Sequence, residues 1–299
     1  MSMPFYVSPE QIMRDKADYA RKGIGRGRSC VTLQYAGGIL MVAPNASSAL
    51  HKISELYDRI AFAAVGRYNE YEDLRKAGVT YADITGYQFD RGDVTARAIA
   101  NWYAQTLGRI FTDNNKPYEV EVVVAEVGEE PDSDQIYRIT FDGSVTDEPG
   151  FVAFGGQADQ VAAALKDRFS DGMSLAEALG AALAALAAPG NGDSQLSASQ
   201  LEVAILDRAR AHRTFRRLQG PRLEELIAQA KASGSAETVD PEESEPEAAP
   251  AKAGPTEAAS GGAASAGAAS AKPKPASPPS DEGHPPTGPS SAGSDGIPR

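Results

Sequence analysis

Apolar and polar residues follow two different periods along this chain, and its first segment has the period of a helix. Ser8 can cap a helix whose first residue is Pro9, where a missing N–H is harmless, and Gln11 stands where a capping box places its second member. Apolar residues then gather on one side until Gly23, a residue type that often ends helices. Residues 8–22 are therefore predicted to form an amphipathic helix.

The next segment changes to the pattern of strands. Residues 28–45 contain two β-rich runs that meet at Gly37 and Gly38, and glycine accepts the positive φ that a tight hairpin turn demands. Residues 59–66 form a short, continuous apolar run, typical of a strand buried on both faces. Further strands are predicted at 119–127, 135–141, 151–156 and 200–208.

Helical spacing returns between these strands. One helix is expected after residue 66, and the apolar positions from Ile99 to Phe111 predict a second. Two more precede the last predicted strand, the second of them opening with the capping box Ser174–Glu177, and Pro221 starts a final helix. Strand runs and hairpins, rather than strict βαβ alternation, favour antiparallel sheets. The predicted fold class is α/β, of the α+β kind: a four-layer αββα sandwich with two antiparallel sheets flanked by helices.

Composition divides the 299 residues into a body and a tail. Residues 233–299 hold 12 of the 20 prolines and no Phe, Trp or Tyr, so they have nothing with which to build a core and are expected to be disordered. The tail has 10 acidic and 4 basic residues, so half of the net charge of −12 belongs to it. The body is only mildly acidic, which disfavours a duplex-binding domain.

Few residues of the body have a pattern typical of independent chemistry. Cys30 is the only cysteine and the histidines are scattered, so no disulfide, zinc site or cofactor is expected. His51 and His212 lack a nucleophile elbow nearby. The arginine-rich run from Arg208 to Arg217 leaves two interpretations open, a phosphate or nucleic-acid site and a solvated or subunit-facing edge. Without an apolar span or a secretion signal, a cytoplasmic protein that contacts neither membrane nor nucleic acid is expected.

Several long runs of the body resemble the α-type subunits of actinobacterial proteasome core particles. These runs are SPEQIMRDKADYARKGIGRGRS, LQYAGGILMVAPN, HKISELYDRIAFAAVGRYNEYEDLRKAG, YAQTLGRIFTDNNKPYEVEVVVAEV and YRITFDGS. The resemblance covers about residues 3–230 and implies the N-terminal-nucleophile hydrolase fold, which agrees with the αββα sandwich. It divides the chain into a leader and N-terminal helix (1–28), a proteasome-type domain (29–232) and the tail.

The resemblance also implies that this chain is not catalytic. In β-type relatives a threonine becomes the amino end of the first strand, and its free amine activates its own hydroxyl. That threonine would align near Arg28 or Ser29, and Pro44 takes the place of the β-type aspartate. Lys52 falls near the β-type active-site lysine but has no terminal threonine to assist. The alternative is a hydrolase that removes its first 28 residues and uses Ser29 as its nucleophile.

By the same resemblance, the amino end is a gate and Lys52 is a docking residue. The predicted gate consists of Met1, Ser2, Met3, Pro4, Phe5, Tyr6, Val7, Ser8 and Pro9; the alternative is an ordinary frayed terminus. Lys52 would take the C-terminal carboxylate of a ring-shaped AAA ATPase activator, unless it is a surface lysine paired with Glu55. The implied partners are other α subunits in a heptameric ring, β subunits, and protein substrates tagged with prokaryotic ubiquitin-like protein.

Overall fold

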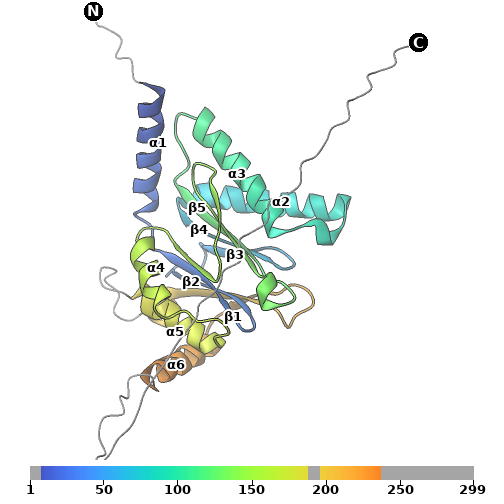
Figure 1. Cartoon of the computed structure of the whole chain (residues 1–299), viewed down its shortest axis with the longest axis vertical. Coiled ribbons are helices and arrows are strands. Elements are labelled where there is room, and N and C mark those ends of the chain that lie inside the picture. The colour runs from blue at the N-terminus through green and yellow to red at the C-terminus, as the bar shows by residue number, and fades with distance from the viewer. Residues whose placement is uncertain (1–7, 188–195, 237–299) are drawn as a thin grey trace, which may run out of the picture. The chain divides into compact units, whose positions relative to one another are not determined.

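The computed structural model describes residues 8–187 and 196–236 (Figure 1). The helices of this part are α1 (Pro9–Ile24), α2 (Tyr68–Gln88), α3 (Ala96–Asp113), α4 (Ala158–Lys166), α5 (Leu175–Leu186) and α6 (Pro221–Ala236). The predicted gate residues 1–7 lie outside the described residues, as does the predicted tail beyond the end of α6. No described helix is both long and apolar enough to cross a membrane.

The described strands form two sheets in which neighbouring strands pair antiparallel. Sheet A has the order β10 (Phe215–Leu218), β9 (Leu201–Asp207), β2 (Gly38–Pro44), β1 (Cys30–Tyr35) and β8 (Phe151–Phe154). Sheet B has the order β3 (Ile53–Tyr57), β4 (Ile60–Gly66), β5 (Val120–Glu126), β6 (Gln135–Ile139) and β7 (Val145–Asp147).

Three apolar clusters hold four layers together. The residues of β2 show why its sequence is continuously apolar: Ile39 and Met41 pack between the two sheets, whereas Leu40 and Val42 pack under the helices of the other face. Helices α4, α5 and α6 cover the outer face of sheet A, and α2 and α3 cover the outer face of sheet B (Figure 1). The predicted αββα sandwich is confirmed.

Three strands were missing from the sequence-based prediction. Strand β7 is three residues long and none of them is buried, so it has no apolar pattern. Strands β3 and β10 contain charged residues, and those of β10, Arg216 and Arg217, are matched by carboxylates on other segments. Such strands are stabilised by their neighbours rather than by their own composition.

The predicted helix ends are correct in part. Ser8 caps α1 by accepting the backbone N–H of Gln11 at 3.3 Å, but the Gln11 side chain donates to Asp15 at 2.7 Å, so the second half of the predicted box is absent. Helix α1 also passes Gly23 and ends at Ile24. A Cβ at position 23 would meet the Glu119 carboxylate at 2.0 Å, so this glycine allows close packing rather than termination. The Ser174–Glu177 box is confirmed.

Candidate functional site

Lys52 lies directly before β3, where the chain crosses from sheet A to sheet B. Its carbonyl oxygen accepts the backbone N–H of Ala64 at 3.0 Å, which continues the pairing with β4. Its Nζ donates to the carbonyl oxygen of Arg28 at 3.2 Å. Glu55, the alternative partner expected from sequence, instead lies 3.6 Å from Arg213. The Lys52 ammonium is thus placed against the backbone that leads from α1 into β1.

Ser29 is part of this backbone and is enclosed, with 1% of its surface exposed. Its Oγ accepts the backbone N–H of Gln157 at 3.0 Å. The hairpin register, in which Val31 faces Val42, brings Pro44 to the level of Ser29, so this position of β2 offers no carboxylate. A free amine at Ser29 would require cutting the chain behind helix α1.

Cys30 is the next residue and is fully enclosed between the sheets. Burial raises the pKa of its thiol to about 11, which the nearby Lys52 ammonium only partly opposes. The thiol therefore stays protonated at neutral pH. Cys30 is therefore a buried, unreactive packing residue.

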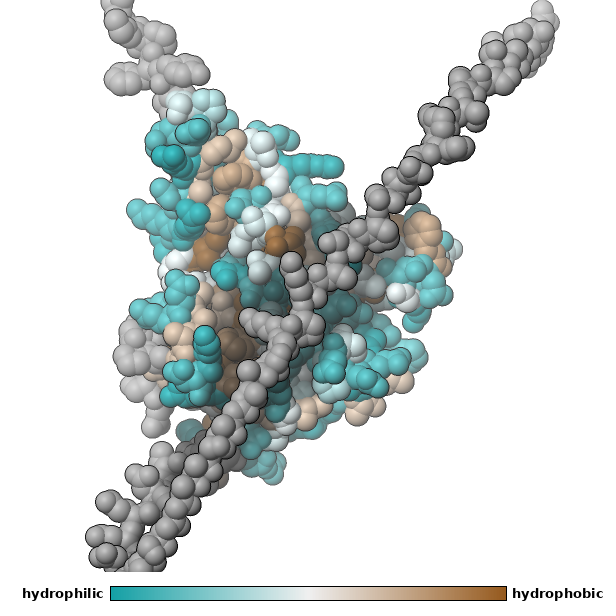
Figure 2. Space-filling view, in the orientation of Figure 1, coloured by the Kyte–Doolittle hydropathy of each residue, from teal (hydrophilic) through white to brown (hydrophobic). Residues whose placement is uncertain are grey.

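Helix α1 is anchored to the body at several points. Ala20 is fully buried between the sheets, and Lys16 donates from Nζ to the carbonyl oxygens of Phe111 and Thr112 at 3.0 and 3.2 Å. These carbonyls belong to the last turn of α3, where a cation is favourable. Most of the face seen in Figure 2 is hydrophilic. Several of the apolar residues on this face lie along α1. Residues 1–7 are therefore joined, at Ser8, to a helix that is itself held against the body.

The arginine-rich run from Arg208 to Arg217 is largely occupied by contacts within the chain. Arg208 makes two hydrogen bonds of 2.8 Å to the fully buried carboxylate of Asp134. Arg213, Arg216 and Arg217 pair with Glu55, Asp207 and Glu202. The matching carboxylates leave little free positive charge for phosphate, which favours a structural interpretation of this run.

Replacing Arg208 by lysine is expected to lower the free energy of unfolding by about 1–2 kcal/mol, because an ammonium cannot reproduce the two parallel bonds to Asp134. Arg210→Lys is the matched control, since Arg210 is exposed and its guanidinium donates to the carbonyl of Arg213 rather than to a carboxylate. Urea-induced unfolding of both variants measures the difference. Equal stability of Arg208→Lys and the parent would contradict the structural role of the pair.

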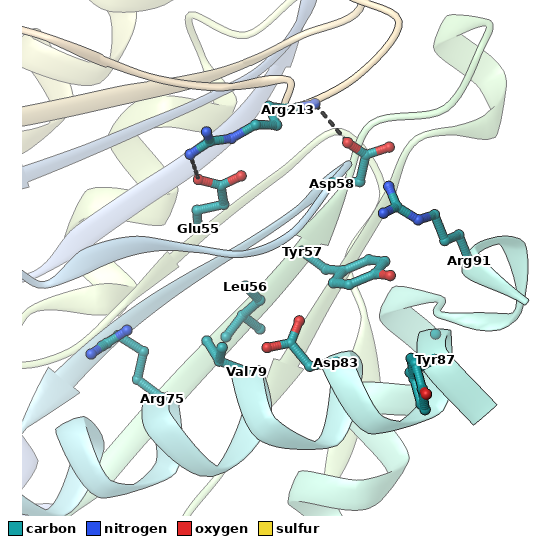
Figure 3. Close-up of a pocket in the computed structure, with 11 residues that line it drawn as sticks. Glu55, Leu56, Tyr57, Asp58, Arg75, Val79, Asp83, Tyr87, Arg91 and Arg213 are labelled. Carbon is teal, nitrogen blue, oxygen red and sulfur yellow. Dashed lines mark hydrogen bonds and ion pairs between the residues drawn. The ribbon is translucent and has the colours of Figure 1, made fainter. Parts of the chain in front are cut away.

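A cleft that was not anticipated from sequence opens at one end of sheet B, with a volume of about 590 Å³. The end of β3 provides Tyr57 and the turn after it Asp58, α2 provides Asp83 and Tyr87, and Arg91 follows α2 (Figure 3). Both signs of charge line this cleft. It has neither a nucleophile with a base nor a set of metal ligands, since no three His, Cys, Asp or Glu side chains gather suitably anywhere in residues 8–187 and 196–236.

Comparison with known proteins agrees with the geometry. A family model described as "Proteasome subunit" matches residues 24–206. The proteasome subunit alpha of Streptosporangium roseum is 67% identical over 245 residues, which cover 82% of this chain and 93% of that protein. The proteasome subunit alpha of Thermomonospora curvata is 68% identical over 229 residues, which cover 77% of this chain and 99% of that protein. That of Thermobifida fusca is 65% identical over 230 residues, covering 77% and 92%. The chain therefore belongs to the proteasome subunit family, as one of its α-type members.

Proposed function

We propose that this chain is a non-catalytic α-ring subunit that controls access of protein substrates to a proteolytic chamber formed by β subunits. Seven copies form a ring, and their leaders, residues 1–7, together with Ser8 and Pro9, close its central opening. A ring-shaped AAA ATPase docks on the α ring in the cytoplasm, opens the gate and delivers proteins tagged with prokaryotic ubiquitin-like protein. The relatives' name, proteasome subunit alpha, supports the assignment to the α ring.

The observation that carries this proposal is the contact between the Lys52 ammonium and the carbonyl of Arg28, at 3.2 Å. An ammonium has three donors, so it can bind an incoming carboxylate while it still holds this carbonyl. The carboxylate would then lie beside the segment that joins α1 to β1. Because it binds where the leader's helix is attached, it can favour one position of the leader over another. Several weak contacts of this kind around one ring reinforce each other.

The surroundings of Ser29 support the proposed absence of catalysis. Its hydroxyl is buried and bonded to a backbone N–H, and α1 precedes it in the chain. The rival function, self-processing at Ser29, has one observation in its favour. The Lys52 ammonium contacts the carbonyl of Arg28, and this is the carbonyl of the peptide bond that would be cut.

The intact mass of the purified chain separates these two functions. We expect a mass that retains residues 2–28, and no peptide hydrolysis by the chain alone, because Ser29 has no free amine. Ser29→Ala should lower the mass only by the one oxygen atom that the substitution removes, and should still retain residues 2–28. A mature protein that begins at Ser29 and cleaves peptides without β subunits would reject the proposal in favour of the self-processing hydrolase.

A further inference from the structure

Glu202 is a charged residue near the start of the mostly apolar strand β9, and it is only 6% exposed. Its Oε2 accepts Asn45 Nδ2–H at 2.8 Å and the Lys52 backbone N–H at 2.9 Å. Its Oε1 accepts the Ile53 backbone N–H at 3.2 Å and a guanidinium N–H of Arg217, and His51 Nδ1 lies 3.3 Å from it. One carboxylate therefore joins both ends of the connection between β2 and β3 to sheet A.

These contacts offset the free-energy cost of burying the Glu202 carboxylate. A carboxylate that is buried away from water is tolerated only when hydrogen-bond donors or cations surround it, and here Arg217 supplies the positive charge. Arg217 also donates to the carbonyl of Ile53 at 2.7 Å, so the pair holds both the N–H and the C=O of that residue. The first residues of β3 are thus fixed by side chains of β9 and β10, in addition to their pairing with β4.

Lys52 is held on two sides as a result. Its backbone N–H is bound by Glu202, and its carbonyl is bound by Ala64 of β4. The ammonium is the part of Lys52 that remains able to take a new partner, and a fixed backbone reduces the entropy lost when it does so. A site that depends on one lysine gains affinity from support of this kind.

We propose that Glu202 is the positioning residue of the Lys52 site: by fixing the backbone of Lys52, it presents the ammonium to a peptide carboxylate. This inference rests on the docking function proposed above. Glu202 itself contacts no activator and acts only through Lys52. The amide of a Glu202→Gln variant keeps the size of the side chain but turns one acceptor into a donor, opposite N–H groups that also donate.

The test uses cores assembled with β subunits from the parent chain or from a variant. The probe is a synthetic peptide that carries the C-terminal residues of the ring ATPase, as the free acid and as the C-terminal amide. Stimulation of peptide hydrolysis is expressed relative to the basal rate of the same core. We expect Glu202→Gln to raise the half-maximal concentration of the free-acid peptide roughly fivefold, the effect of losing about one net hydrogen bond.

Glu121→Gln is the matched control. Glu121 is also a buried glutamate, 5% exposed, and it pairs with Arg138 and accepts the backbone N–H of Gly155 without touching the β2–β3 connection. If both variants shift the half-maximal concentration equally, the effect is general destabilisation and the inference is wrong. If Glu202→Gln fails to assemble, Glu202→Asp is judged by the same shift, because its shorter carboxylate withdraws from the Lys52 N–H.

Lys52→Ala separates failure of the inference from failure of the proposed function. A shift in Lys52→Ala with none in the Glu202 variant overturns the positioning role alone. No shift in Lys52→Ala overturns the docking function, and with it the role of Glu202. A shift in both, with an unchanged Glu121→Gln core, supports the two together.

Discussion

Deletion of Met1–Val7, apart from an initiating methionine, is expected to raise peptide hydrolysis by a core assembled with β subunits about tenfold or more. The reason is the population of open gates. If the open gate lies a few kcal/mol above the closed one, it is populated to about 0.1–10%. The rate of peptide hydrolysis is then limited to that fraction of the rate of a permanently open core. Without the leaders the opening is permanent. The effect is measured as the initial rate of cleavage of a short fluorogenic peptide.

A chain that ends at Ala236 is the control for this deletion, because it removes residues from the other end and leaves the leader intact. Its rate should equal that of the parent. The leader variant Phe5→Ser with Tyr6→Ser keeps the length but removes the aromatic rings, and we expect a smaller increase because packing in the closed state is weakened. A deletion variant that cleaves peptides no faster than the parent would reject the gate.

Lys52→Ala is expected to impair ATPase-stimulated degradation much more than basal peptide hydrolysis. A hydrogen bond to a charged group contributes about 1.5–3 kcal/mol, so each docked carboxylate loses at least about tenfold in affinity. Because several carboxylates act together around one ring, the loss for the whole ATPase should be on the order of a hundredfold or more. The measurement is the ATPase concentration that gives half-maximal degradation of a tagged protein.

Lys166→Ala is the matched control, since Lys166 is an exposed lysine at the end of α4 and lies on a different element from the β2–β3 connection. It removes the same charge and should leave the half-maximal ATPase concentration unchanged. Lys52→Arg keeps the charge but not the shape of the donor. Its half-maximal ATPase concentration is expected to lie between those of the parent and of Lys52→Ala. Equal stimulation of the Lys52→Ala core and the parent would contradict the docking pocket.

The fold was predictable from sequence where a strand has both faces buried, because most residues of such a strand are apolar. Strands β2, β4, β5 and β9 are of this kind. Strand β3 could not be predicted from sequence, since its polar residues depend on partners that are remote along the chain. The ends of α1 were predicted less well than its existence, because Gly23 is needed for close packing against Glu119 and not for a cap.

The candidate site was predictable only in part. Lys52 was selected by resemblance to a family, and its contacts could not follow from local pattern because Arg28 and Glu202 are 24 and 150 residues away along the chain. Sequence did hold one unused signal for Glu202. A charged residue within a continuous apolar run is rarely buried without a partner, so its presence in β9 already indicated a compensated carboxylate.

An electron-microscopy image of the chain coexpressed with its β partner tests the central claim most directly. The account predicts a barrel of four stacked rings, with this chain, still carrying its leader, in the two outer rings and with density across the axial opening. Removal of Met1–Val7 should clear that density and keep the barrel intact. A barrel with this chain in the inner rings, or a particle without rings, would contradict the account.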